Sequence, residues 1–305
     1  MEMKSAGAKF PERSLSRSEQ WRQATPFVLS HLAVLGAFWS GVTWQAVALC
    51  FVLLFVRLWG ITAGYHRYFA HRTYKTGRGF QFFLAVLAQS SSQKGVLWWA
   101  AHHRVHHKLS DQDGDVHSPV QNSFLYAHVG WLFDDNEETR WDKIRDFAKY
   151  PELRWLNRYW AVPPALLALA CFSIAGWPGL FIGFFLSTVL LWHNTFLINS
   201  VTHVWGKKRF DTGDESRNNM VTALLTLGEG WHNNHHHYQS SCRNGFYWWE
   251  IDVTYCVLKM LSWIGLVWDI REVPPRVLEE GRRRDAGEIG EEPRSEPAKE
   301  FPLAA

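Results

Sequence analysis

The stretch TPFVLSHLAVLGAFWSGVTWQAVALCFVLLFVRLWGITAG, residues 25–64, decides the class of protein. Arg57 is its only charged residue. Crossing the hydrocarbon core of a bilayer takes about 20 apolar residues, so this stretch can cross twice. Ser40-Gly41 supplies a turn near its middle. We interpret the stretch as a helical hairpin, and we expect Arg57 to extend its side chain toward the membrane surface.

A second stretch repeats the pattern. AVPPALLALACFSIAGWPGLFIGFFLSTVLLWHNTFLINS, residues 161–200, has no Lys, Arg, Asp or Glu, and Gly176-Trp177-Pro178-Gly179 marks its turn. Two long helices in a soluble core are the alternative. The 18 Trp and 20 Phe residues favour a bilayer, because aromatic side chains collect at its interfaces. The sequence predicts an all-α membrane protein with four transmembrane helices in two hairpins.

The basic residues predict the orientation of the chain. Their clusters fall before residue 25, between 65 and 158, and after 206, so the positive-inside rule places these parts in the cytoplasm. The net charge of +3 is too small to indicate a nucleic-acid partner. We expect a cytosolic N-terminal arm at 1–24, a hairpin at 25–64, a cap segment with an interfacial helix and two histidine clusters at 65–159, a hairpin at 160–203, a cap segment with a third cluster at 204–278, and a disordered tail at 279–305.

Three histidine clusters should converge on one cytoplasmic face. HRYFAH lies at 66–71, and H-x-x-H-H occurs at 103–107 and again at 232–236. Residues three and four apart share a helix face, so the histidines of each H-x-x-H-H can point together. His66 and His71 are five apart, about 140° around an α-helix, which suits two different metal ions. The well-spaced histidines are His66, His71, His103, His106, His107, His203, His232, His235 and His236.

Nine such histidines indicate metal binding. Neutral imidazole is the commonest metal ligand and suits Fe, Zn and Cu. Nine ligands are too many for one ion but fit two ions with four or five nitrogens each. Asn199, four residues before His203, can complete one shell directly or through a water, and Glu229 is expected to orient a ligand ring.

The remaining histidines receive no role from the spacing. His102 and His237 adjoin the clusters without fitting the repeated pattern. The histidines with no partner in the clusters at helical spacing are His31, His117, His128 and His193.

The segments ITAGYHRYFAHRTYK, HHRVHHKLSDQDGDVHSP, NSVTHVWG and GEGWHNNHHHY together resemble the membrane acyl-CoA desaturases of the stearoyl-CoA Δ9 type. The likeness runs from about residue 60 to 269. It implies four spans, a cytosolic helical cap holding two nonheme irons ligated by the nine histidines, and Asn199 as a water-bridging ligand. It also implies insertion of a cis double bond into a fatty acyl thioester, with O2 as co-substrate.

The resemblance further implies an acyl tunnel. Trp99 stands at the place of a tunnel-lining tryptophan, and Gln93, Thr195 and Phe196 stand near the tunnel's bend. Leu54 lies near its floor. Phe196 departs from the family's animal members, which have Trp there, so the bend can differ in width.

The implied partners are a fatty acyl-CoA or another acyl carrier, membrane lipid, and a separate electron donor, either cytochrome b5 or a ferredoxin-type protein with its reductase. No cytochrome-b5-like HPGG segment occurs in the sequence. The basic residues Lys207, Lys208 and Arg209 could steer an acidic donor. We expect a multi-pass protein of a bacterial plasma membrane rather than of the endoplasmic reticulum, with the active site and both termini in the cytoplasm.

Two other functions remain open at this point. A membrane diiron hydroxylase of alkanes or lipids would use the same ligand pattern. A histidine-rich metal transporter would need liganding or acidic residues along a path through the spans, and the clusters here lie beside the predicted spans instead.

Overall fold

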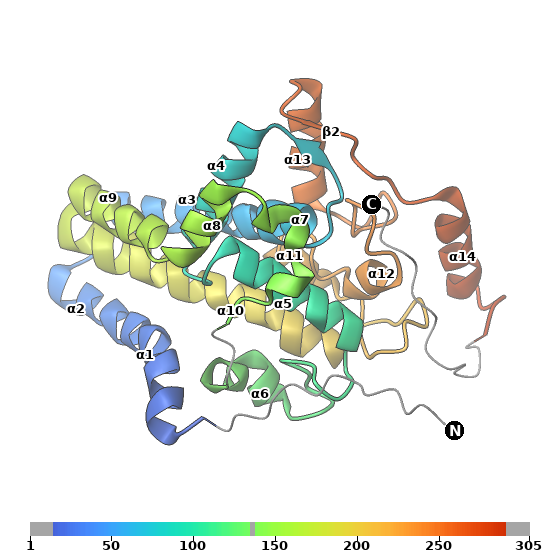
Figure 1. Cartoon of the computed structure of the whole chain (residues 1–305), viewed down its shortest axis with the longest axis horizontal. Helices are drawn as coiled ribbons and strands as arrows, with labels where there is room; N and C mark the ends of the chain where they lie inside the picture. The colour runs from blue at the N-terminus through green and yellow to red at the C-terminus, as the bar shows by residue number, and fades with distance from the viewer. Residues whose placement is uncertain (1–14, 135–137, 291–305) are drawn as a thin grey trace.

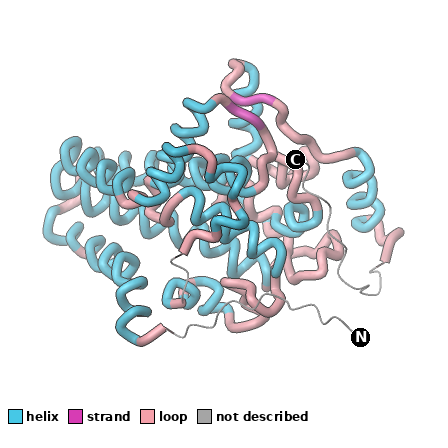
Figure 2. Tube along the Cα trace, viewed as in Figure 1, coloured by secondary structure: helices cyan, strands magenta, loops and turns pink. Residues whose placement is uncertain are grey.

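The computed structural model describes residues 15–134 and 138–290, and helices dominate it (Figures 1 and 2). Strands β1 (Lys75–Thr76) and β2 (Val267–Trp268) form a short antiparallel pair. The helices of the first half are α1 (Arg17–Val34), α2 (Gly36–Ser40), α3 (Trp44–Trp59), η1 (Gly60–Ala70), α4 (Arg78–Gln89), α5 (Val96–Leu109), α6 (Phe124–His128), η2 (Gly130–Phe133), η3 (Trp141–Lys143), α7 (Arg145–Ala148) and α8 (Pro151–Arg158). Those of the second half are α9 (Val162–Pro178), η4 (Gly179–Leu186), α10 (Ser187–Ser200), η5 (Val201–His203), α11 (Met220–Leu225), α12 (His232–His237), α13 (Val253–Trp263) and α14 (Pro275–Asp285).

The first apolar stretch breaks where the sequence predicts a turn. Gly41 has φ +76°, a left-handed conformation that glycine adopts without strain. The Thr43 side chain then accepts a hydrogen bond from the N–H of Ala46 and caps the start of α3. Helix α1, the first of the two helices before this turn, begins at Arg17, eight residues ahead of the expected boundary.

The second apolar stretch reverses inside one apparent helix. Ala175 and Gly176 have non-helical angles, and α9 packs back against η4 beyond them. The turn therefore lies at the start of the predicted Gly-Trp-Pro-Gly segment. The η4–α10 helix also contacts α1 and α3, so it occupies the centre of the apolar end of the molecule (Figure 1).

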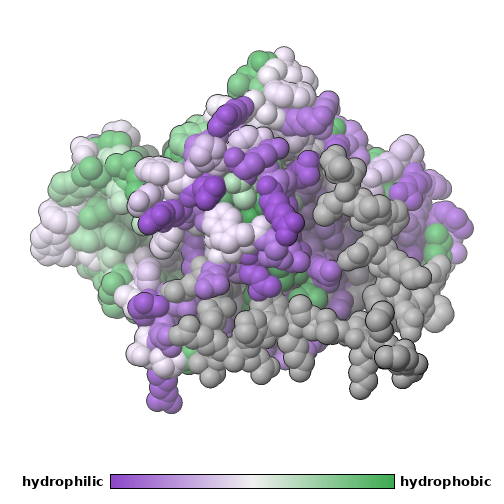
Figure 3. Space-filling model, in the orientation of Figure 1, coloured by the Kyte–Doolittle hydropathy of each residue, from purple (hydrophilic) through white to green (hydrophobic). Residues whose placement is uncertain are grey.

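Two helical runs in the described residues are long and apolar enough to cross a membrane, Trp44–Ala70 and Val162–His203. The second contains the reversal at Gly176. Apolar residues gather at the end of the molecule where α9 and α2 lie (Figure 3). These observations support two membrane-crossing runs, and the four separate spans expected from the sequence remain a prediction.

The run α3–η1 carries the chain from the apolar end into the buried core. Side chains on one face of α3, such as Phe51 and Phe55, are exposed, whereas every residue of η1 is buried. Helix α4 packs closely on η1, because a Cβ at Gly64 would lie 3.2 Å from the carbonyl oxygen of Leu84. Glycine thus permits the contact that fixes η1 in place.

Arg57 does not reach the surface. Its side chain is 0% exposed. Its guanidinium donates to the Ser187 and Thr188 hydroxyls at 2.6 and 2.8 Å and to the carbonyl oxygen of Ser90 at 3.2 Å. The expectation of a membrane-surface position is therefore wrong. The partners come from α10 and from the loop after α4, which a search for nearby charges in the sequence cannot reveal.

The C-terminal part of the described chain is ordered further than expected. Helix α14 spans Pro275–Asp285, and its Val277 packs with Phe210, Phe246 and Tyr247. The prediction of disorder from residue 279 is wrong for 279–285. Residues 291–305 of that tail, and residues 1–14 of the predicted N-terminal arm, lie outside the described part of the chain.

Candidate metal centre

His66 and His71 are brought together by the winding of η1. In a π-helix each N–H bonds the carbonyl group five residues earlier, and the N–H of His71 lies 3.1 Å from the carbonyl oxygen of His66. Residues five apart therefore stand on one side, and the two ring centroids are 4.7 Å apart. The expectation that these histidines serve different metals assumed an α-helix and is wrong, because both join one group.

Each H-x-x-H-H motif divides between two groups of histidines. Relative to its first residue, the residue three positions on lies about 60° to one side of a helix and the residue four positions on about 40° to the other. In α5, His103 and His107 therefore stay together while His106 turns to the second group; α12 repeats this division. The five-histidine group comprises His66, His71, His103, His107 and His235, and the four-histidine group comprises His106, His203, His232 and His236.

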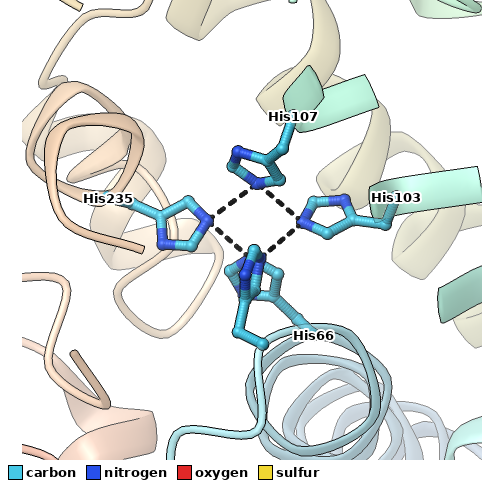
Figure 4. Close-up of side chains that lie close together, drawn as sticks. His66, His103, His107 and His235 are labelled. Atoms are coloured by element: carbon cyan, nitrogen blue, oxygen red, sulfur yellow. Dashed lines mark hydrogen bonds between the residues drawn. The ribbon is translucent and has the colours of Figure 1, made fainter. Parts of the chain in front are cut away.

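The Nε2 atoms of the five-histidine group converge on one point. His235 Nε2 lies 3.0 Å from the Nε2 atoms of both His66 and His107. His103 Nε2 lies 2.9 Å from that of His107 and 3.0 Å from that of His71. Figure 4 shows four of these rings, from η1, α5 and α12, pointing at one another. In the four-histidine group the Nε2 atoms of His203 and His232 are 3.1 Å apart.

Aspartates hold three rings of the four-histidine group from behind. Asp115 lies 2.9 Å from Nδ1 of His106. Asp111 lies 2.7 Å from Nδ1 of His203, and Asp214 lies 2.6 Å from Nδ1 of His236. A carboxylate on Nδ1 fixes the proton there and leaves the Nε2 lone pair free, which is the usual arrangement of metal-binding histidines.

In the five-histidine group one ring has a carboxylate behind it. Glu229 lies 2.7 Å from Nδ1 of His66. Unlike the aspartates, Glu229 also accepts two hydrogen bonds from Arg67, at 2.8 and 3.2 Å, and Arg67 is itself paired with Asp252 at 2.9 Å. Glu229 therefore orients a ring as expected, although the ring belongs to His66 and not to His232, its neighbour in the sequence.

The environment keeps most of these histidines neutral. Burial and the charges of neighbouring histidines hold the pKa values of His71, His103 and His107 well below the ordinary value, and those of His232 and His235 as well. Neutral imidazole is the form that binds metal. Burial alone would raise the pKa of Glu229, but the charges of Arg67 and His66 bring it down to about 2, so it stays an anion at neutral pH.

Both groups fit a metal cation. Lone pairs that converge at about 3 Å repel one another unless a proton or a cation lies between them. The buried Nε2 of His236 has no hydrogen-bond partner among the described residues, and a metal would satisfy it. Ligand sets of imidazole nitrogens with carboxylates behind them suit a divalent transition metal. Each group can therefore hold one ion.

A cavity of about 70 Å³ opens beside His103. Trp99 stacks on the His103 ring, with centroids 4.9 Å apart, and its Nε1 donates to Gln93 at 3.2 Å. Gln93 in turn donates to the Thr195 hydroxyl at 3.1 Å. Phe196 and Asn199 also line this space. Five residues singled out in the sequence are thus together, next to the five-histidine group.

A family model described as "Fatty acid desaturase" matches residues 42–254. The chain belongs to the fatty acid desaturase family. Its relatives include an "sn-2 palmitoyl-lipid 9-desaturase" of Nostoc sp. (strain 36), 35% identical over 278 residues, which are 88% of this chain and 96% of the relative. An "Acyl-CoA C20 Delta5-desaturase" of Anemone leveillei is 36% identical over 243 residues, 78% of this chain and 77% of the relative.

An "sn-1 stearoyl-lipid 9-desaturase" of Anabaena variabilis is 35% identical over 257 residues, 82% of this chain and 93% of the relative. The relatives' names thus include both lipid and acyl-CoA desaturases. The comparisons establish membership of the desaturase family. They do not single out the acyl-CoA Δ9 type, which the sequence resembles.

Some predicted residues of this desaturase are not brought to the two groups. Leu54 is buried within α3 and does not line the cavity beside His103. Nδ1 of His102 donates to the carbonyl oxygen of Trp98 at 2.9 Å, and His237 stacks on Phe210; both stand outside the groups, as expected. Asn199 lines the cavity, and its part as a water-bridging ligand remains a prediction.

The basic residues suggested for donor steering are paired within the desaturase. Lys207 lies 2.7 Å from Asp285 and Lys208 lies 3.2 Å from Glu215. Arg209 lies 2.6 Å from Glu250. Local carboxylates balance these charges, which weakens their case as a steering surface.

Sequence reasoning missed the three aspartates and His117. Asp111, Asp115 and Asp214 lie in loops, where helical spacing gives no signal. The run D-Q-D-G-D-V-H at 111–117, directly after an H-x-x-H-H, was the available hint. His117 lies beside His106, with ring centroids 4.4 Å apart, and shares Asp115 with it.

Proposed function

We propose that this desaturase inserts a cis double bond into a fatty acyl chain, carried as a thioester and most simply as acyl-CoA, at the Δ9 position. The observation that carries the proposal is the pair of imidazole groups, with five and four converging nitrogens, beside a cavity lined by Gln93, Trp99, Thr195 and Phe196. Two nonheme irons would be the resident metals.

In this proposal the iron ions supply the oxidising chemistry with O2, which no acid or base side chain can supply for an unactivated alkyl C–H bond. The overall change is CH2–CH2 plus O2, two electrons and two protons to CH=CH and two waters. The five-histidine group and the four-histidine group would each hold one ion, with Asn199 adding a water-mediated contact to the four-histidine group.

The residues of the chain have positioning tasks. Asp111, Asp115, Asp214 and Glu229 fix the ring orientation and the Nδ1 proton of the histidines in front of them. Gln93 joins Trp99 to Thr195 and so holds the two sides of the cavity at a set separation. The acyl carbons to be oxidised would lie along Trp99 and Phe196, with Leu54 limiting how far the chain reaches.

The acyl carrier is the least constrained part of the proposal. Relatives named for acyl-CoA and for lipid substrates are about equally similar to this chain. The resemblance in the sequence favours acyl-CoA. A lipid-bound acyl chain would approach from within the bilayer instead, and the two carriers require different shapes at the mouth of the cavity.

The arrangement in the membrane follows the sequence. We propose four spans, within residues 25–64 and 160–203, with the cap segments 65–159 and 204–278 and both termini in the cytoplasm of a bacterial cell. The support is the two long apolar runs and the placement of basic residues. A separate electron donor, cytochrome b5 or a ferredoxin-type protein with its reductase, would supply the electrons.

The test is expression in cells unable to make unsaturated fatty acids, followed by mass spectrometry of their lipids with the double bond located by chemical cleavage. We expect a cis double bond at carbon 9. The purified enzyme is then given stearoyl-CoA or a stearoyl glycerolipid with a reconstituted donor, and iron is counted, with two ions expected per chain.

Each outcome of this test is informative. Conversion of the glycerolipid but not the CoA ester would move the proposal to a lipid carrier. Hydroxylated product without alkene would replace desaturation by hydroxylation. Iron-loaded protein that makes neither product with a working donor would overturn the proposed function.

A further inference from the structure

Three histidines outside both groups form a hydrogen-bonded chain across three helices. His31 of α1 and His193 of α10 have Nε2 atoms 3.0 Å apart. Nδ1 of His193 lies 3.0 Å from Nε2 of His128 in α6. The chain ends at Ser200, whose hydroxyl is 3.0 Å from Nδ1 of His128, and at the carbonyl oxygen of Phe27, 2.8 Å from Nδ1 of His31.

The number of protons in this chain is limited. His31 must carry a proton on Nδ1, because a carbonyl oxygen only accepts. Each of the two ring-to-ring contacts takes one proton. The fourth contact lies between His128 and Ser200. When the three rings are neutral, the serine hydroxyl donates its proton to His128. When His128 carries an extra proton, His128 donates to Ser200, and Ser200 donates to the Phe196 carbonyl oxygen 2.9 Å away. All contacts are therefore satisfied with no extra proton or with one.

A second extra proton must break the chain, because two N–H groups would then face each other at one contact. Nothing nearby compensates such charges. The three rings are half-buried, and Phe27 and Phe196 pack on them with centroid separations of 4.2 to 6.2 Å. Among the described residues, the polar contacts of the rings are with one another, with Ser200 and with the backbone of Phe27 and Phe196, with no Asp, Glu, Lys or Arg.

The three hydrogen-bonded histidines lie next to one wall of the cavity. Helix α6 is followed by η2, which carries Trp131, and the Trp131 ring packs on Phe196 at 5.7 Å where both line the cavity. Helix α6 itself is loosely covered, with Leu125 75% exposed and Phe124 44% exposed. The two bonds of His128 to His193 and Ser200 tie α6 to α10.

We propose that His31, His193, His128 and Ser200 act as a clasp that positions the 124–133 segment on α10, and so sets the cavity wall formed by Trp131. The clasp is closed with zero or one extra proton and opens when two enter. His128 is a positioning residue in this scheme. The role of the wall in selecting acyl chains rests on the proposed function, whereas the closing and opening of the clasp do not.

The direction with pH follows from burial, which lowers the pKa of His128. A histidine whose folded-state pKa lies below its unfolded value loses stability as pH falls below about 6.5. The clasp is therefore closed at pH 7.5 and opens toward pH 5.

The first experiment follows the clasp without using activity. Exposed Leu125 is replaced by Cys and spin-labelled in a Cys256→Ser background, since the other three cysteines are buried. In the full-length protein in nanodiscs we expect an immobile label at pH 7.5 and a mobile one at pH 5. His128→Phe should be mobile at both values, and His128→Gln, which keeps a donor and an acceptor, should be immobile at pH 7.5.

The second experiment measures selection between 16- and 18-carbon substrates. Loss of a hydrogen bond of ordinary strength corresponds to about a fivefold change. We expect His128→Phe to change the KM ratio of the two substrates about fivefold with kcat little altered, and His128→Gln to restore the wild-type ratio. A mere loss of folding would lower kcat for both and would not be rescued by Gln.

An immobile label in His128→Phe at pH 7.5, a mobile one in His128→Gln at pH 7.5, or a wild-type label equally mobile at pH 7.5 and pH 5 would overturn the clasp. Label data as expected with an unchanged KM ratio would overturn the link to the cavity wall. If the wild type forms no alkene at all, the proposed function fails, while the label experiment still decides the clasp.

Discussion

In the four-histidine group three of the four rings have a carboxylate on Nδ1, whereas in the five-histidine group one of five does. The groups that donate hydrogen bonds to these carboxylates also differ between the two histidine groups. Asp111 and Asp214 receive hydroxyl and backbone N–H groups. Asp115 receives the N–H of Asp111, and Glu229 receives the guanidinium of Arg67. Within the described residues, none of the three aspartates pairs with Lys or Arg.

The two groups therefore differ in the number of metal ligands and in the negative charge around those ligands. The five-histidine group offers more ligands but little negative charge around them. The four-histidine group offers fewer ligands and an uncompensated anionic surrounding, which favours a more highly charged ion. The two sites should therefore differ in metal affinity and in sensitivity to acid, and four measurements test this.

The largest effect is expected from removing a ligand. His107→Ala in the five-histidine group and His236→Ala in the four-histidine group should each lower the metal content from two ions to one. Desaturation should fall by more than about 100-fold, beyond what loss of a residue behind a ligand causes. Metal is counted by plasma mass spectrometry.

His102→Ala and His237→Ala are the matched controls, since both rings adjoin the motifs but stand outside the groups. They should keep two ions. Full metal content in His236→Ala would remove the four-histidine group as a site.

Next comes removal of a carboxylate. Asp214→Asn should weaken metal binding in the four-histidine group about 10- to 100-fold, the usual cost of such a change. Glu229→Gln should weaken the five-histidine group less, because Arg67 already balances that carboxylate. Metal release is followed during a chelator titration with cobalt-substituted protein.

Asp269→Asn serves as the control, because Asp269 is exposed and pairs with Lys75 away from both groups. If Asp214→Asn and Glu229→Gln released metal at equal chelator concentrations, the proposed difference in charge would be wrong.

Acid should affect the metal-free groups differently. Burial holds the pKa of His71 well below its unfolded value, so this site loses stability as pH falls below about 6.5. Burial also opposes protonation of His106, but Asp115 outweighs it and raises the pKa, so His106 contributes stability at low pH. Between pH 7.5 and 5, hydrogen exchange in η1 should therefore rise more than in η5, which carries His203 of the four-histidine group, after correction for intrinsic rates.

The smallest effect is expected where neither group is touched. Thr195→Val removes the hydroxyl that accepts from Gln93, and Gln93 links only indirectly to His103 through Trp99. Both ions should remain, and KM should rise about fivefold, equivalent to one ordinary hydrogen bond. Loss of metal from this variant would mean that the cavity and the five-histidine group are not separable.

The sequence predicts much of this arrangement, and the misses have physical causes. Charge-free runs reveal the apolar helices because a bilayer excludes charge, and the nine histidines that the spacing selects all enter the two groups. The division of each H-x-x-H-H depends on a difference of about 100° between neighbouring side chains, which spacing alone leaves ambiguous. The clasp at His31 joins residues from three helices, and helical spacing carries no information on contacts between helices.

The π-winding of η1 also limits how this chemistry can be moved to another protein. The letters H-x-x-x-x-H grafted onto an ordinary α-helix would point their two imidazoles apart, because that winding places residues five apart about 140° from each other. A designer would have to import the widened turn as well, together with a neighbour that presses on glycines as α4 does at Gly64. Backbone pitch, rather than residue choice, makes His66 and His71 partners.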